Sequence, residues 1–324
     1  MAKNYGWCTE MVRYYLGIDG GGTKTDAVLF SSEGGIVQRV IGAGTNPNSI
    51  HDEQVTERFQ DIFLKLMSHN RPDSVTGCFA GLAGSDHPAI TRKLARCIRQ
   101  ACPVPIDHLQ VGNDAMNALW SGTEGGPGLV VIAGTGSIAY GMQRNGKDFR
   151  IGGWGYLFGD EGSGYDIGRE AIRCTLMSYD GRKPKTQLTA ALENYFKVDA
   201  IADIVPIIYR CSKNVIAGLA PHVETAALRG DQLAHEVMSH AARSLILLIR
   251  SGMRRFNEDI EVVLTGGVWE SSIIREMVST AIQRAFIFPK HPPVYGSIAK
   301  CCMEWEKAKS RLILENVKKQ IRRE

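Results

Sequence analysis

Two short segments rich in glycine and threonine carry residues suited to binding phosphate. The first covers residues 19–25 (DGGGTKT) and the second residues 134–137 (GTGS). Glycines let backbone N–H groups approach phosphate oxygens closely, and threonine hydroxyls add further donors. The GxxxxGK[ST] pattern of a P-loop is absent. Two such loops could hold the phosphates of one nucleoside triphosphate, and the contacts expected to it are Gly21, Gly22, Thr23, Lys24, Thr25, Thr135, Gly136 and Ser137.

Neither loop fits the dinucleotide-binding pattern GxGxxG, which leads from a strand into a helix. Residues 20–25 lack the final glycine, and residues 27–31 after them are strand-like. Residues 134–139 fit the relaxed form GxGxxA, but residues 138–142 alternate as strand residues do. A turn at residues 145–146 leaves no room for a crossover helix of about 10 residues. Both loops are therefore predicted to join two strands as phosphate-binding hairpins.

Two carboxylates stand at the ends of predicted strands. Asp19 lies inside the first loop, where a carboxylate beside phosphates requires a cation between them; Mg²⁺, held through water, is the natural occupant. Asp114 precedes a predicted helix and fits either a helix N-cap or a general base for a substrate hydroxyl. Asn113 beside it would contact a polyhydroxy substrate.

The segment of residues 152–164 (GGWGYLFGDEGSG) is glycine-dense, aromatic and acidic, and it leads into a helix. Trp154 fits either a core position or a sugar site. In a sugar site, peptide groups around Trp154 and the carboxylate of Asp160 would bind hydroxyls, since one carboxylate accepts two O–H donors. The expected sugar contacts are Asn46, Asn113, Asp114, Gly153, Trp154, Gly155 and Asp160.

The elements that must position these residues alternate between strands and helices, which predicts an α/β fold. In the first half we expect an antiparallel meander of three strands, followed by alternating helices and strands. Its strands are residues 12–18, 27–31, 36–41, 75–83 and 109–111, and its helices are residues 52–67, 90–102 and 115–120.

The second half restarts the pattern after a linker at residues 121–128, so two related domains are expected, residues 1–121 and 122–324. Its predicted strands are residues 129–133, 138–143 and 261–264, and its predicted helices are residues 161–177, 185–196, 201–211, 220–229, 232–254, 269–284 and one from about 295.

Composition excludes several classes of protein. The 324 residues include 44% hydrophobic and 22% charged residues, which is typical of a globular chain. The net charge of +4 is spread along the chain and gives no basis for nucleic-acid binding. No apolar run approaches the roughly 20 residues of a membrane span. The eight cysteines form no CxxC pair and predict reduced thiols in a cytoplasmic protein. Met11 is a candidate start residue.

Taken together, these motifs resemble the superfamily of actin, hexokinase and heat-shock-chaperone ATPases. Within it, the sequence resembles the N-acetylglucosamine kinase family of BadF/BadG/BcrA/BcrD-type ATPases. The matching stretches lie between Leu16 and about Ala299: LGIDGGGTKTDAVL, GTNPNS, VGNDAMNALW, AGTGSIAYG, GGWGYLFGDEGSGYDIG and LTGGVWESS.

The resemblance implies two ribonuclease-H-like (actin-like ATPase) domains with ATP and a sugar in the cleft between them. It implies phosphoryl transfer from ATP with Mg²⁺ to the C6 hydroxyl of N-acetylglucosamine, with Asp114 as the general base. Thr23 and Thr135 match the phosphate contacts. The nucleoside contacts implied are Gly218, Gly267 and Ser271. A homodimer is compatible with this family.

Three alternatives stay open. The sugar could be glucosamine or N-acetylmuramic acid, which differ from N-acetylglucosamine by one acyl group or one lactyl ether. The chain could be an ATPase activator of a dehydratase or reductase, a class that holds an iron–sulfur cluster between subunits by paired cysteines. A non-catalytic sugar sensor is the third, although retention of both Asp19 and Asp114 argues against it.

Overall fold

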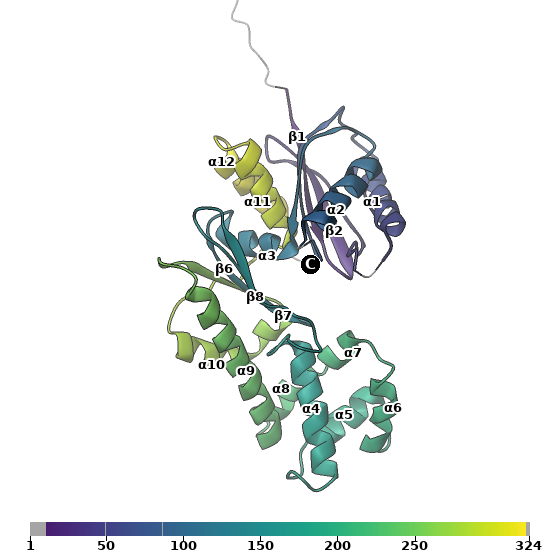
Figure 1. Ribbon diagram of the computed structural model, residues 1–324, viewed down its shortest axis with the longest axis vertical. Helices are drawn as coiled ribbons and strands as arrows, with labels where there is room; N and C mark the ends of the chain where they lie inside the picture. Colours follow the sequence, from purple (N-terminus) through teal and green to yellow (C-terminus); the bar gives the residue numbers. More distant parts are fainter. Residues whose placement is uncertain (1–10, 49, 86, 322–324) are drawn as a thin grey trace, which may run out of the picture. The chain divides into compact units, whose positions relative to one another are not determined.

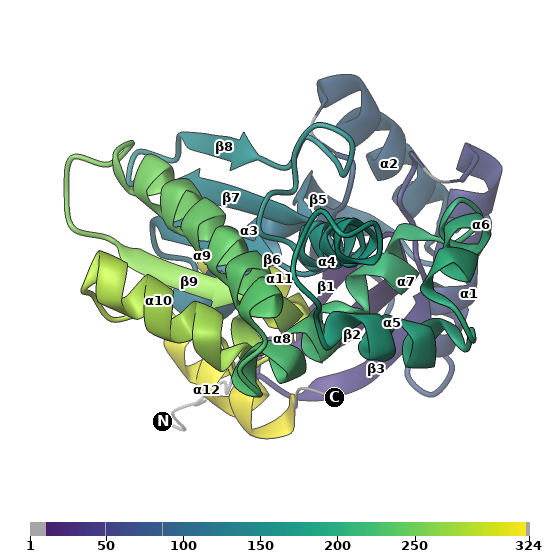
Figure 2. The same ribbon diagram turned by 90° about the horizontal axis from the view of Figure 1, so that it is seen from below.

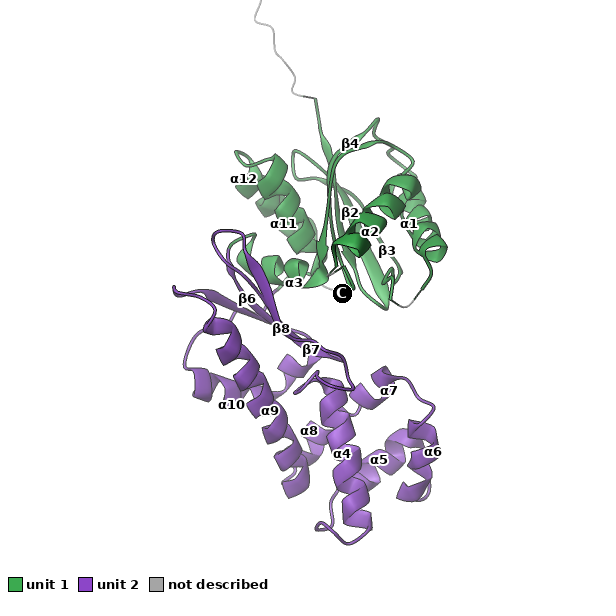
Figure 3. Cartoon of the chain, viewed as in Figure 1, with its two compact units in different colours: residues 1–126, 290–324 green, residues 127–289 purple. Residues whose placement is uncertain are grey.

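The computed structural model describes residues 11–48, 50–85 and 87–321. The chain divides into two compact units, shown in green and purple in Figure 3. One unit joins the N-terminal part, up to Gly126, with the segment from Lys290 onward; the other runs from Pro127 to Pro289. The predicted division at residues 121/122 is thus displaced to 126/127. The structure groups the last segment with the first unit and not with the second domain as expected, because the helix Val294–Trp305 packs on the first sheet.

The first unit is built on a five-stranded sheet (Figure 1). Its strand order is β3 (Ile36–Ala43), β2 (Lys24–Ser31), β1 (Tyr14–Gly20), β4 (Val75–Leu82) and β5 (Ile106–Asn113). Strands β1, β2 and β3 pair antiparallel, which confirms the predicted meander. Strands β4 and β5 run parallel to β1, so the carboxyl ends of three strands meet at one edge of the sheet.

Helices cover both faces of this sheet (Figure 1). On one face lie α1 (Asp52–Leu66) and α2 (Pro88–Ala101); α1 buries an apolar stripe that includes Phe59 and Phe63. The other face carries α3, α11 and α12. Their bounds are Asp114–Thr123, Val294–Trp305 and Ser310–Gln320.

The second unit contains a four-stranded sheet of order β8 (Asp148–Gly152), β7 (Ser137–Met142), β6 (Gly128–Ala133) and β9 (Glu261–Thr265). As in the first sheet, three strands form an antiparallel meander, and the first of them also pairs parallel with a later strand: β6 with β9, as β1 with β4. This likeness supports the predicted internal repeat. Strand β8 was not predicted. The two sheets and the helices around them confirm the α/β fold class.

Helix α9 (Gln232–Met253) lies along the second sheet (Figure 2), and α4 (Gly164–Tyr179), α8 (Ala220–Leu228) and α10 (Ser272–Ile282) pack against it. Helix α5 (Leu188–Phe196) packs on α4 and α8. The short helices are η1 (Ile201–Asp203), α6 (Ile204–Ile208), α7 (Lys213–Ala217) and the 3₁₀ turn η2 (Gly267–Glu270). Helix α7 was not predicted.

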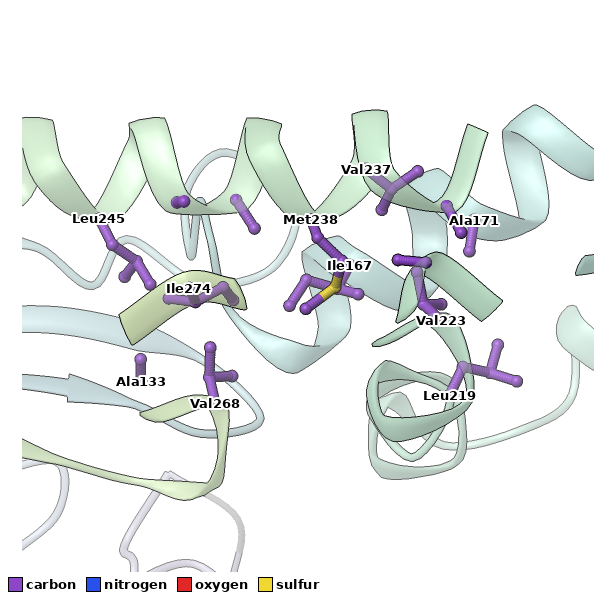
Figure 4. Close-up of a cluster of buried hydrophobic side chains, with 14 of the residues drawn as sticks. Ala133, Ile167, Ala171, Leu219, Val223, Val237, Met238, Leu245, Val268 and Ile274 are labelled. Carbon is purple, nitrogen blue, oxygen red and sulfur yellow. The ribbon is translucent and has the colours of Figure 1, made fainter. Parts of the chain in front are cut away.

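The core of the second unit joins these helices. Side chains from four of them converge in Figure 4, among them Ile167 of α4, Val223 of α8, Met238 of α9 and Ile274 of α10. All four are buried, with exposed fractions between 0% and 1%. This packing fixes the ends of the helices relative to the loop that follows β6.

Candidate functional site

The first glycine loop is a hairpin between β1 and β2, as predicted. Its turn is closed by a hydrogen bond from the Gly21 N–H to the carbonyl of Lys24, at 2.8 Å. Thr23 and Lys24 are exposed, as ligand contacts would have to be. Thr25 is buried, and its hydroxyl lies 3.0 Å from that of Thr45. Thr25 therefore supports the loop from inside, which corrects the expectation that its side chain contacts ATP.

Asp19 stands at the end of β1, beneath this loop. Its Oδ1 accepts a hydrogen bond of 2.7 Å from the side-chain amide of Asn117. Burial raises the pKa of the Asp19 carboxyl to about 7, with a further contribution from the nearby charge of Asp114; the amide hydrogen bond opposes the shift. The carboxylates of Asp19 and Asp114 together place negatively charged oxygen atoms at this end of the sheet. This environment fits a Mg²⁺ ion.

Asp114 begins α3, immediately after β5. The N-cap of this helix is Asn113, whose Oδ1 accepts a hydrogen bond of 2.8 Å from the Ala115 N–H. The interpretation of Asp114 as the N-cap is therefore wrong. Asp114 is half-buried, near enough to Asp19 to raise its pKa. A general base for a substrate hydroxyl stays the functional prediction for this carboxylate.

Asn46 reaches the same edge of the first sheet from the segment after β3. Its Oδ1 accepts a hydrogen bond of 2.9 Å from the Asn48 N–H. A Cβ on Gly84, just after β4, would lie 2.8 Å from this oxygen, so the side chain of Asn46 packs against the end of β4. Because β1, β4 and β5 end together, the fold gathers Asp19, Asn46 and Asp114 from separate parts of the sequence.

The second glycine loop is also a hairpin, between β6 and β7, and its backbone is tied to the start of α4. The Gly164 N–H donates to the carbonyl of Gly134, at 2.8 Å. Ser137 is buried, and its hydroxyl donates to the carbonyl of Glu161, also at 2.8 Å. As with Thr25, this corrects the expectation that the Ser137 side chain contacts ATP.

Asp160 lies against the second loop. A Cβ on Gly136 would be 2.8 Å from Oδ2 of Asp160, and the Ser137 N–H points at Oδ1 over 3.4 Å. The residue is 7% exposed, and burial raises the pKa of its carboxyl. Its backbone is left-handed, with φ of 60°. The structure thus places Asp160 next to a predicted phosphate contact; its predicted role toward a sugar stays a prediction.

The aromatic segment between β8 and Asp160 is exposed. Trp154 has 67% of its surface in solvent, so the interpretation of this residue as core is wrong. The guanidinium of Arg150 stacks on its ring, 4.4 Å from the centroid. Gly153 and Gly155 on either side have φ of 68° and 88°, a backbone conformation that residues with a side chain rarely adopt. The segment therefore presents both peptide groups and an aromatic face to solvent.

A cavity of about 580 Å³ lies within the second unit. It is lined by all three residues expected at the nucleoside, Gly218, Gly267 and Ser271, together with Thr135 of the second loop. These four residues come from three distant parts of the sequence. The volume and the mixture of apolar and polar lining suit a nucleoside-sized ligand. The geometry thus supports the prediction of a nucleotide pocket.

Sequence reasoning missed three residues that support these sites. Glu224 lines the cavity and binds the start of α10. Asn117 and Ser297 form hydrogen bonds beneath Asp19. The position of Asn117, three residues after Asp114 on a predicted helix, was a usable signal. Ser297 and Glu224 carried none, since only the tertiary fold brings them to their sites.

The comparisons with known proteins agree with this arrangement. Residues 16–298 match the profile of the BadF/BadG/BcrA/BcrD ATPase family. The chain belongs to this ATPase family. The resemblance stated from the sequence motifs is thereby confirmed.

Two relatives of this chain are named as sugar kinases. The chain is 35% identical to an N-acetylmuramic acid/N-acetylglucosamine kinase of Clostridium acetobutylicum, over 79% of this chain and 86% of the relative. It is 31% identical to an N-acetyl-D-glucosamine kinase of Dictyostelium discoideum, over 84% of this chain and 91% of the relative.

A solved structure from Chromobacterium violaceum, named provisionally as an N-acetylglucosamine kinase, matches with a TM-score of 0.72 and 26% identity. The match covers 88% of this chain and 97% of that one. The fold is therefore that of this kinase type. None of the helices that the structure describes is long and apolar enough to cross a membrane.

Proposed function

We propose that this chain is an ATP-dependent amino-sugar kinase that phosphorylates the C6 hydroxyl of N-acetylglucosamine. The observation that carries the proposal is the cavity in the second unit, where the predicted residues Thr135, Gly218, Gly267 and Ser271 meet. The names of the two relatives supply the class of acceptor.

In this proposal Asp114 is the general base. Its carboxylate accepts the proton of the C6 hydroxyl while the hydroxyl oxygen bonds to the γ-phosphorus of ATP. The bond from that phosphorus to the β–γ bridging oxygen breaks, and ADP leaves. Asn46, at the same edge of the sheet, and the exposed segment around Trp154 would bind the other sugar groups.

The backbone of the two hairpins would bind the phosphates. In the first, Gly21, Gly22, Thr23 and Lys24 form an exposed or half-exposed turn. The second hairpin would contribute Thr135 and Gly136. Each supplies N–H donors that need no reorganisation when charge develops in the transition state.

Asp19 would hold the Mg²⁺ ion that accompanies ATP, through a water molecule. When bound, the ion neutralises phosphate charge. The raised pKa of the Asp19 carboxyl fits this role, since a cation would relieve the repulsion from Asp114 that contributes to the shift.

The alternative of an iron–sulfur activator loses support from the structure. Cys301 and Cys302, the adjacent pair, lie inside the first unit with exposed fractions of 0% and 1%. Burial raises the pKa of both thiols, that of Cys302 to about 12. A cluster shared between subunits needs exposed thiolates, so this pair is unsuited to hold one.

A coupled assay of ADP release tests the proposal with N-acetylglucosamine, N-acetylmuramic acid and glucosamine as acceptors. We expect the highest kcat/KM with N-acetylglucosamine. Asp114→Asn should lower kcat by a factor of about 10²–10⁴, as for loss of a general base, while ATP binding is retained. Asp107→Asn, at the exposed start of β5, is the matched control. Near-normal turnover by the Asp114 variant would refute the assignment of the base.

A further inference from the structure

A buried polar network lies behind Asp19, and the chemical steps of the proposed reaction do not use it. Its centre is Asn117, on the first turns of α3, with 0% of its surface exposed. A buried amide without partners would cost free energy, so its contacts are informative. All of them are to the elements that position the candidate site.

The amide nitrogen of Asn117 binds the ends of two strands. Its two hydrogens face three acceptors: Oδ1 of Asp19 at 2.7 Å, and the carbonyls of Ile18 and Gly81, each at 3.2 Å. The shortest of these contacts is to the carboxylate. Because Asp114 lies three residues earlier on the same helix, Asn117 ties the helix that carries the proposed base to the strand that carries Asp19.

The amide oxygen is held from a third element, the closing helix α11. The hydroxyl of Ser297, also 0% exposed, lies 2.9 Å from Oδ1 of Asn117 and 2.8 Å from the carbonyl of Ile18. The single hydrogen of this hydroxyl is shared between these two oxygens, and the other end of the Asn117 amide faces acceptors only. These contacts define the amide nitrogen as the end that faces Asp19.

Close packing makes this geometry specific to the residues present. A Cβ on Gly81 would lie 2.3 Å from the amide nitrogen of Asn117, and one on Gly296 would lie 2.1 Å from the backbone oxygen of Asn117. Gly81 on β4 thus makes room for the side chain of Asn117, and Gly296 lets α11 approach the backbone of α3 at the same residue.

We propose that Asn117, oriented by Ser297, is a positioning residue for magnesium–nucleotide binding. Its amide fixes the Asp19 carboxylate through Oδ1 and leaves Oδ2 for the water molecule through which Asp19 would hold the metal ion. This inference rests on the proposed role of Asp19. Partners of this kind behind a metal ligand are typically worth 10- to 100-fold in metal affinity or activity.

The test measures binding, independent of sugar turnover. Calorimetric titration of the full chain with a non-hydrolysable ATP analogue, with and without Mg²⁺, gives the factor by which Mg²⁺ increases affinity. For Asn117→Leu, similar in size but unable to donate, we expect this factor to fall about tenfold or more. Affinity for ADP without Mg²⁺ should stay within about twofold of the wild-type value.

Ser297→Ala gives a second measurement should Asn117→Leu fail to fold. It keeps the amide but removes the donor that orients it, and the factor should fall about threefold. The matched control is Ser121→Ala, which removes a buried hydroxyl that donates only to the Ala118 carbonyl within α3, at 2.8 Å. This control should keep the wild-type factor.

Three results would overturn the inference. The first is a wild-type protein whose affinity for the analogue does not depend on Mg²⁺, and the second is a Ser297→Ala variant in which Mg²⁺ increases affinity as much as in the wild type. The third is an equal fall of this factor in Ser121→Ala, which would indicate general loosening of α3. Failure of the wild-type chain to phosphorylate any sugar would instead count against the proposed function. The two failures are therefore distinguishable.

Discussion

The carboxylate of Glu224, on α8, accepts a hydrogen bond of 3.0 Å from the hydroxyl of Ser271 at the start of α10. The same oxygen accepts from the Ser272 N–H at 2.7 Å. Both Glu224 and Ser271 line the cavity proposed for the nucleoside. One side chain thus closes the N-terminal end of a helix and shapes the wall of the pocket.

Glu224→Ala should therefore weaken both stability and nucleotide binding. It leaves the donors of Ser271 and Ser272 without their acceptor, and the free energy of unfolding should fall by about 1–3 kcal/mol. The KM for ATP should rise, whereas Glu224→Gln, which keeps one acceptor oxygen, should lose less. Urea unfolding and steady-state kinetics measure the two effects. Glu276→Ala, on the exposed face of α10, is the control. If it changed the free energy of unfolding and the KM for ATP as much as Glu224→Ala does, the hydrogen bonds of Glu224 would not explain these effects.

Gly267 offers a way to block the cavity without disturbing the fold. A Cβ built there meets no atom within 4 Å, and the backbone is outside the left-handed region. Gly267→Leu should raise the KM for ATP at least tenfold, because its side chain would occupy the cavity, and should leave the melting temperature nearly unchanged.

The neighbouring glycine provides the contrast. Gly266 has φ of 109°, and a Cβ there would lie 2.3 Å from the carbonyl oxygen of Ala133. Gly266→Ala should therefore lower the melting temperature, unlike Gly267→Leu. ATP kinetics that are unchanged in Gly267→Leu would show that the cavity is not the nucleotide pocket.

Local sequence patterns were enough to predict the two hairpins and most of the strands. Glycines between alternating apolar residues specify a strand–loop–strand unit, and the structure has one after β1 and one after β6. The helix expected from residue 161 begins only at Gly164, since Gly162 has φ of 77° and Ser163 is the N-cap. Such a delay depends on backbone conformation that periodicity does not reveal.

The placement of α11 could not be predicted in the same way. Its return to the first sheet depends on close approach: a Cβ on Gly17 would lie 2.9 Å from the Ile298 side chain. The contact joins residues about 280 positions apart, and no local pattern encodes it. For the same reason the sequence indicated residues that are predicted to contact ligands, such as Asp114, but not the buried residues that support them, such as Asn117.

Substitution of Trp154 tests the sugar-binding prediction. Because this side chain is exposed, its removal can affect sugar binding without affecting the stability of the fold. With 67% of its surface in solvent, Trp154→Ala should change the free energy of unfolding by no more than about 0.5 kcal/mol. The KM for the sugar should rise about tenfold, and the KM for ATP should stay the same. Phe158→Ala, which removes an aromatic ring that is 85% exposed in the same segment, is the control. Equal effects of both variants on the sugar KM would argue against a specific role for Trp154.

The raised pKa of the Asp19 carboxyl predicts that the stability of the folded chain decreases as the pH rises. Its carboxyl has a pKa of about 7 in the folded chain against an ordinary value of 3.8, so between these values the folded chain holds more protons than the unfolded one. Stability from this group is thus fully present below about pH 4 and is lost as the pH rises through about 7. Asp19→Asn removes the titration, so its melting temperature relative to wild type should increase from about pH 4.5 to about 7.5 and then level off. Mg²⁺ added at about pH 8 should stabilise the ionised carboxylate of wild-type Asp19, and should therefore reduce the difference in melting temperature between Asp19→Asn and the wild type. A difference that is constant across the range would contradict the burial of charge at Asp19.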